Sequence, residues 1–172
     1  MNRDVGKKGP YFGKYRGVVS DVQDPLFQGR IRARVSDVYG DADSGWALPC
    51  APFAGGGAGL FGLPKVGSGV WMEFEGGDAD FPIWVGCWFG VASDLPSELL
   101  APPYKKVILK TEAGHKIILD DTPGVGGVTL ETASGQKVVL SASGIEIDNG
   151  QGGKVQLQGP QVNVNGGALQ VI

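Results

Sequence analysis

The clearest shortage in this sequence is of aromatic residues in its C-terminal part. All the Phe, Trp and Tyr residues lie between Tyr11 and Tyr104, so residues 105–172 contain none. A globular core of that length normally includes aromatic rings, because they supply much of the buried area per residue. Their absence excludes an ordinary core for the tail and divides the 172-residue chain into two parts.

Residues that form redox or metal sites are also scarce. The chain has two cysteines, Cys50 and Cys87, both in apolar strand-like runs, and one histidine, His115. Because cysteine is among the most buried residue types, we expect two buried, reduced thiols, with a structural disulfide as the alternative. The tail has no cysteine and no second histidine, so a metal ligand set is incomplete. We expect no metal and no cofactor.

The sequence has no long apolar run. No stretch approaches the roughly 20 apolar residues of a membrane-spanning helix. The charged residues Arg3, Asp4, Lys7 and Lys8 precede any apolar segment, so the N-terminus lacks the pattern of a secretory signal peptide. We therefore expect the protein to be made and assembled in the cytoplasm.

Glycine and proline are abundant, with 30 and 11 residues, and they separate short apolar runs. In residues 29–38, Ile31, Ala33 and Val35 alternate with polar residues, as in a half-buried strand. The runs of this kind in the first part are 11–20, 29–38, 46–48, 70–75 and 82–88. Because no amphipathic helix lies among them, they predict a closed antiparallel barrel of the OB type over residues 11–91, after an N-terminal segment of residues 1–10.

The pattern changes after residue 91. Residues 92–104 are rich in proline and predict a linker. Residues 105–172 repeat short alternating runs separated by glycines, a pattern typical of a β-solenoid. The runs are 106–111, 115–120, 128–132, 136–141, 145–148, 154–158 and 161–165. Each has only two or three apolar side chains on one face, all Val, Ile or Leu, which suit a narrow interior shared by several chains. We therefore expect an obligate oligomer.

The chain also carries motifs of one known family. In the first part these are Tyr15-Arg-Gly-Val-Val19, Asp24-Pro25, Gly29-Arg-Ile31, Trp46, Pro49, Pro64, Gly67, Val70-Trp-Met-Glu-Phe-Glu-Gly-Gly-Asp78 and Pro82; in the tail they are Gly114-His115 and Leu119-Asp-Asp121. In order and spacing they resemble the spike proteins of contractile injection systems. Such spikes include phage baseplate assembly protein V, the VgrG proteins of type VI secretion and the spikes of extracellular toxin-delivery particles.

The resemblance implies an all-β protein with an N-terminal OB-fold barrel followed by a C-terminal intertwined trimeric β-helix, the needle. It implies a homotrimer that docks on a baseplate hub protein at the barrel end and contacts the target membrane only mechanically. It also implies a part in a phage tail or in a released or anchored bacterial injection particle. The positions expected in the trimer core are Val138, Leu140, Ile145, Ile147, Val155 and Leu157.

Residues 165–172 end the chain on apolar side chains, without charged or histidine ligands. An exposed apolar end would be an aggregation hazard, so we expect a partner to cover it. By resemblance, that partner is a small tip protein of the proline-alanine-alanine-arginine (PAAR) repeat family, or an effector. Docking by strand addition would use Leu169, Val171 and Ile172 as apolar contacts.

The chain departs from some spikes in three respects. VgrG proteins have a large hub region ahead of the barrel, whereas about ten residues precede Tyr11, so we expect a separate hub chain. Some phage spikes insert a lysozyme domain where this chain has a short linker. Others bind iron at the apex through a His-x-His pair, whereas this chain has only His115. We expect no peptidoglycan hydrolase activity and no metal-capped tip.

Other function classes remain as alternatives. Arg30, Arg32 and Arg34 alternate on one strand face and could follow a phosphate backbone, which would make the protein an OB-fold nucleic-acid or oligosaccharide binder. The net charge of -3 argues against nucleic acid. A polysaccharide-cleaving enzyme needs paired carboxylates, but the neighbours Asp120 and Asp121 point to opposite faces of a strand. The glycine-rich loop 54–62 lacks the ending and the following helix of a phosphate-binding loop.

Overall fold

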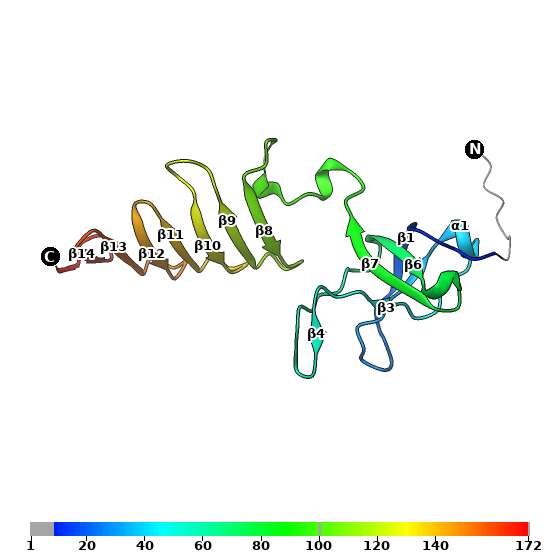
Figure 1. Cartoon of the computed structure of the whole chain (residues 1–172). Helices are drawn as coiled ribbons and strands as arrows, with labels where there is room; N and C mark the ends of the chain where they lie inside the picture. Colours follow the sequence, from blue (N-terminus) through cyan, green and yellow to red (C-terminus); the bar gives the residue numbers. More distant parts are fainter. Residues whose placement is uncertain (1–8, 100, 172) are drawn as a thin grey trace. The chain divides into compact units, whose positions relative to one another are not determined.

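The structure is a computed structural model that describes residues 9–99 and 101–171 (Figure 1). It divides into two compact units, the first ending at Asp94 and the second beginning at Leu95. In both, most of the regular secondary structure is β-strand, which confirms the expected all-β class. Each unit is described by itself.

The first unit contains a curled five-stranded sheet with the strand order β2-β1-β6-β7-β3. Its strands are β1 (Tyr15–Asp21), β2 (Arg32–Arg34), β3 (Leu48–Pro49), β6 (Gly69–Phe74) and β7 (Pro82–Trp88). An isolated bridge between Ile31 and Ala47 joins the two sheet edges, with backbone hydrogen bonds of 3.2 and 2.8 Å. This closure produces the OB-like barrel that the sequence predicts.

The barrel core consists of the alternating side chains that the sequence pattern identifies. Ile31, Ala33 and Val35 are fully buried, and β6 contributes Val70 and Met72. Burying an aliphatic side chain of this kind stabilises the fold by about 1.5–3 kcal/mol. At one end of the core, the ring of Phe74 packs against those of Tyr11, Tyr15 and Tyr39.

Two segments of the first unit differ from expectation. The strand predicted over 29–38 stops at Arg34, and residues Ser36–Tyr39 form a short helix, α1, whose Val38 still reaches the core. The glycine-rich loop contains a small hairpin of β4 (Ala54–Gly55) and β5 (Ala58–Gly59). A two-residue turn with Gly57 at a positive φ of 76° explains why glycine is required there.

The two cysteines are free thiols, but both are exposed, so the expected burial is wrong. Cys50 follows the last residue of β3, and Cys87 is the next-to-last residue of β7. The apolar neighbours of each cysteine in the sequence therefore do not predict burial of its thiol.

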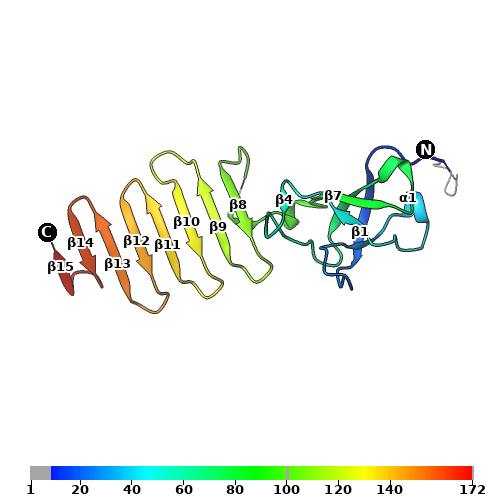
Figure 2. The same ribbon diagram turned by 60° about the horizontal axis from the view of Figure 1, so that its bottom comes forward.

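The second unit is an eight-stranded antiparallel sheet in which each strand pairs with the next along the chain (Figure 2). All seven predicted runs correspond to strands, and β15 adds an eighth. The strands are β8 (Lys106–Lys110), β9 (Lys116–Asp120), β10 (Gly127–Glu131), β11 (Lys137–Ser141), β12 (Gly144–Asp148), β13 (Lys154–Gln158), β14 (Gln161–Val164) and β15 (Leu169–Val171). Within one chain the arrangement is a meander and not the stacked turns of a solenoid, because the connections are too short for parallel crossovers.

Glycine has a specific role where these strands approach closely. Gly144 begins β12 with a φ of 135°, and a Cβ atom placed there would lie 2.0 Å from the carbonyl oxygen of Leu157. Any side chain would push β12 and β13 apart. Gly127 has the same relationship to Leu140, so glycine spacing in the tail is set by strand packing as well as by turns.

The segment that follows β7 contains secondary structure in its first part, residues 89–99. It contains two single-turn 3₁₀ helices, η2 (Ala92–Asp94) and η3 (Ser97–Leu99). The Asp94 carboxylate accepts hydrogen bonds from the backbone N–H groups of Gly90 and Val91, at 2.9 and 3.1 Å. Residues from Leu95 onward belong to the C-terminal unit.

Candidate oligomerisation face

One face of the C-terminal sheet is a continuous apolar surface made of two cross-strand ladders. The first ladder is Leu109, Ile117, Leu130, Val138, Ile147, Val155, Val164 and Leu169. The second is Val107, Leu119, Val128, Leu140, Ile145, Leu157 and Val162. Directly opposed aliphatic pairs stabilise neighbouring strands, and here they extend through the sheet without interruption.

Within a single chain this face remains open. Leu140 is 41% exposed although it lies in the middle of the second ladder, and Leu109, the first residue of the first ladder, is 64% exposed. An open groove of about 910 Å³ follows the first ladder. Soluble monomers rarely expose an apolar surface that runs through an entire sheet, so the face requires a partner.

All six residues predicted for a trimer core lie on this face. Val138, Ile147 and Val155 belong to the first ladder, whereas Leu140, Ile145 and Leu157 belong to the second, as the strand register shows. The structure thus brings them together on one surface. Their burial at a threefold axis stays a prediction.

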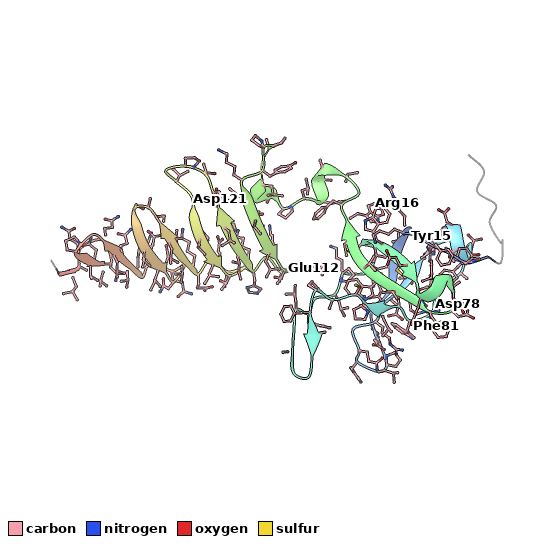
Figure 3. The ribbon with its side chains drawn as sticks, viewed as in Figure 1. Tyr15, Arg16, Asp78, Phe81, Glu112 and Asp121 are labelled. Atoms are coloured by element: carbon pink, nitrogen blue, oxygen red, sulfur yellow. The ribbon has the colours of Figure 1, made fainter. Side chains whose placement is uncertain are left out.

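Side chains project from the strands of this sheet (Figure 3). The reverse face is polar, and its charges are paired along the sheet. Lys116 lies 3.3 Å from Glu131, and Lys154 lies 3.1 Å from Glu146 and 3.3 Å from Asp148. Hydrogen bonds from Gln156 and Lys154 lower the pKa of Glu146, and the bond to Glu146 raises the pKa of Lys154. A face with satisfied charges can stay in water, so only the apolar face calls for burial.

The η3 segment is attached to the polar face of the first two strands. The Glu98 carboxylate lies 2.9 Å from Lys110 and 3.1 Å from Lys116, and Lys106 donates to the Glu98 backbone carbonyl at 3.0 Å. The hydrogen bond from Lys110 is the main reason why the pKa of Glu98 falls to about 2. In the central row of this face, β8 and β9 carry two apolar residues that pair with each other, Ile108 and Ile118.

Sequence analysis does not identify Glu98 as an anchor, because it lies in a proline-rich stretch that predicts a linker. The sequence of β8 and β9 nevertheless contains a sign that another segment covers them. The central positions of the polar face are Ile108 and Ile118 in β8 and β9, but Gln156 and Asn163 in β13 and β14. Apolar residues on a water-facing side indicate that something covers them at that end of the sheet.

Two of the three expected tip-docking residues, Leu169 and Val171, lie in the last strand, β15. Leu169 in β15 is 60% exposed, and the backbone of Val171 pairs with Val162. The side chain of Val171 and all of Ile172 lie outside the described residues. The docking role of this end stays a prediction.

The three alternating arginines of residues 30–34 have partners within the chain. Arg30 pairs with the buried carboxylate of Asp24, and Arg32 donates to the Ser44 carbonyl at 3.0 Å. Arg34 lies 3.8 Å from Asp43. Because these guanidinium groups already have partners within the chain, they are poorly placed to bind a phosphate backbone. The nucleic-acid alternative is therefore not favoured.

The structure also shows the surroundings of His115. The Nδ1 atom of His115 accepts a hydrogen bond from the backbone N–H of Ala133 at 3.3 Å, which is a turn-stabilising contact. Over residues 9–99 and 101–171, no three His, Cys, Asp or Glu side chains are grouped as metal ligands. No helix in the same ranges has the length and apolar character needed to cross a membrane.

Comparison with family models matches both units. Residues 15–89 match the type VI secretion system/phage-baseplate injector OB domain. Residues 106–170 match the phage baseplate V C-terminal trimerisation domain. The chain belongs to the phage-baseplate spike family. No curated protein sequence matches it. The spike family is one of structural domains, and the open apolar ladders coincide with the part described as a trimerisation domain.

Proposed function

We propose that this protein is the central spike of a contractile, phage-tail-like injection particle and that it acts as a homotrimer. The observation that carries the proposal is the uncovered apolar face of the C-terminal sheet, in the region that matches a trimerisation domain. Three copies would bury their aliphatic ladders around a common axis and leave the three ion-paired faces in water. Aliphatic side chains suit such an interior, because rings would not fit a narrow core.

The mechanical role follows from the same arrangement. Contraction of a sheath would drive the spike forward, and the spike must carry axial load without bending. A single exposed sheet would be a weak structural element, but three sheets packed on one interior would stiffen each other. The paired charges on the outer face support this role, since they need no partner.

The partners follow from the family. The barrel would dock on a baseplate hub protein, and the C-terminal end would carry a PAAR-type tip protein or an effector. The spike would touch the target membrane only mechanically, bind no nucleic acid and catalyse no reaction. It would be assembled in the bacterial cytoplasm, as part of a phage tail or of a released or anchored injection particle.

Light scattering coupled to size-exclusion chromatography tests the proposal directly. The expected mass of the purified chain is three times its 17.9 kDa monomer mass. A stable, well-folded monomer at micromolar concentration would contradict the proposal. Cryo-electron microscopy of particles that contain the chain would then test its position, which should be on the central axis of the baseplate.

A further inference from the structure

Two loops of the barrel present a group of exposed apolar residues. The first loop connects β1 to β2 and presents Leu26 and Phe27; the second precedes β6 and presents Phe53, Leu60 and Phe61. We call these five residues the loop patch. Phe27 is 94% exposed and Phe61 is 75% exposed. Large aromatic side chains left in solvent mark an interaction surface when they gather in this way.

The first loop is held rigid from within. Asp24 is only 7% exposed, and its carboxylate accepts hydrogen bonds from the backbone N–H groups of Leu26, Gln28 and Arg30 at 3.0, 2.7 and 3.2 Å. The Arg30 guanidinium closes the loop on the same carboxylate. Phe27 adopts a positive φ of 55°, which costs energy for a residue with a side chain. The loop therefore displays Phe27 in a fixed conformation.

The two loops form one surface. The ring of Phe61 packs on Gly29, where a Cβ atom would lie only 2.8 Å from Cε2 of the ring. Gly29 is in turn fixed by the indole of Trp84, which donates to its carbonyl at 3.3 Å. The backbone N–H of Leu60 donates to the Phe53 carbonyl at 3.2 Å and closes the second loop. A rigid apolar surface loses little conformational entropy when it binds.

The position of the patch along the chain indicates its partner. β1 ends, β6 begins and β7 ends at the same end of the barrel strands, where Val18 pairs with Gly69 and Gly69 pairs with Trp88. Both loops leave the barrel from this end, and so does the chain that leads to the C-terminal unit. Six residues separate Trp88 from Leu95, which span at most about 20 Å. Trimerisation of the C-terminal units would hold these ends of three barrels at high local concentration.

We infer that the loop patch is a contact between barrels, in which the loops of one copy pack on the neighbouring copy of this chain. The inference rests on the proposed homotrimer and adds a second interface to it. The five side chains of the loop patch are all uncharged, so two copies of the patch can meet without charge repulsion. The hub protein is the competing occupant.

Photocrosslinking of the full-length chain tests this interface. The photoreactive residue p-benzoylphenylalanine replaces Phe27 in one variant and Phe61 in another. The control carries it in place of Phe12, which is 70% exposed but lies against Gly77 at the opposite end of β6. All three positions are solvent-exposed, so the fold should tolerate the substitution.

After irradiation and full denaturation, the variants at Phe27 and Phe61 should give covalent dimers and trimers, and the Phe12 variant should give neither. Mass spectrometry should place the crosslinks on the barrel of another copy. A trimer by light scattering without such crosslinks would overturn this inference and leave the proposed function standing. A monomer by light scattering would overturn both. Crosslinks that form only after a hub protein is added would assign the patch to the hub and overturn the inference.

Discussion

Glu98 and Lys110 form an ion pair of 2.9 Å that fixes the segment before the C-terminal sheet onto the sheet itself. Lys116 approaches the same carboxylate, so one acidic side chain joins η3 to both β8 and β9. Because the C-terminal unit begins at Leu95, only six residues connect it to Trp88, the last residue of the barrel sheet.

The first prediction concerns this anchor. Glu98→Gln should lower the stability of the C-terminal unit at neutral pH by up to about 1 kcal/mol, the scale of partly exposed ion pairs. The pKa of Glu98 is lowered from 4.5 to about 2 in the folded chain. Its contribution is therefore complete above pH 4.5 and is lost as the pH falls through about 2. Thermal unfolding at several pH values should show the difference between wild type and variant shrinking over this interval. A constant difference would contradict the anchor.

A second prediction concerns the loop built on Asp24. The Arg30 guanidinium holds the pKa of the Asp24 carboxyl well below its usual range. Asp24→Asn removes the charge that Arg30 pairs with and should lower the melting temperature of the barrel by several degrees. Hydrogen exchange at Leu26 and Gln28 should accelerate. Asp21→Asn is the control, because among the residues that the structure describes Asp21 accepts only a local hydrogen bond, from the backbone N–H of Gln23. Equal effects of both substitutions would show that the loop is not held by this pair.

A third prediction tests the apolar ladders. Leu140→Asp would place three carboxylates in one layer of the shared interior, where each unpaired buried charge costs several kcal/mol. The trimer should fail to assemble, as measured by light scattering. Gln158→Asp is the matched control, because this exposed residue lies on the polar face and should leave the mass unchanged. An intact trimer of the Leu140→Asp variant together with a disrupted Gln158→Asp variant would show that the assignment of the faces is inverted.

A fourth prediction assigns the oligomeric state to the C-terminal unit. A chain that ends at Asp94 retains all the buried core residues of the barrel and should be folded and monomeric at micromolar concentration. The barrel contacts that we infer need the high local concentration that the trimer provides. Circular dichroism and light scattering check both points. A tight trimer of this fragment would make the barrel the main determinant of assembly.

Much of the fold could be predicted because alternation is a strong signal. The run 82–88 coincides with β7, and the alternation of Ile31, Ala33 and Val35 identifies three fully buried residues. The seven runs of the tail all form strands, and the six aliphatic positions chosen from them share one face. Period-two patterns depend only on local geometry, so they survive whatever the chain packs against.

The predictions that failed depend on long-range contacts. The apolar neighbours of Cys50 and Cys87 in the sequence predict burial, but both thiols are exposed in the folded chain. The role of Glu98 depends on lysines that are 12 and 18 residues further along the chain. The helix Ser36–Tyr39 replaces the end of a predicted strand, because the chain must turn at that point before Ala47 pairs with Ile31.

The last prediction concerns the C-terminal end. β15 is the final strand of the sheet and pairs only with β14, so its other edge is open for strand addition in the chain that the structure describes. Leu169 is exposed there, and Val171 and Ile172 continue the apolar character of the sequence. Deleting residues 167–172 should abolish binding of a PAAR-type tip protein in a pull-down and leave the trimer intact, because the ladders from β8 to β14 remain. Light scattering of the truncated chain is the control for assembly. Full capture of the tip by the truncated trimer would place the docking surface elsewhere and reverse the polarity proposed for the spike.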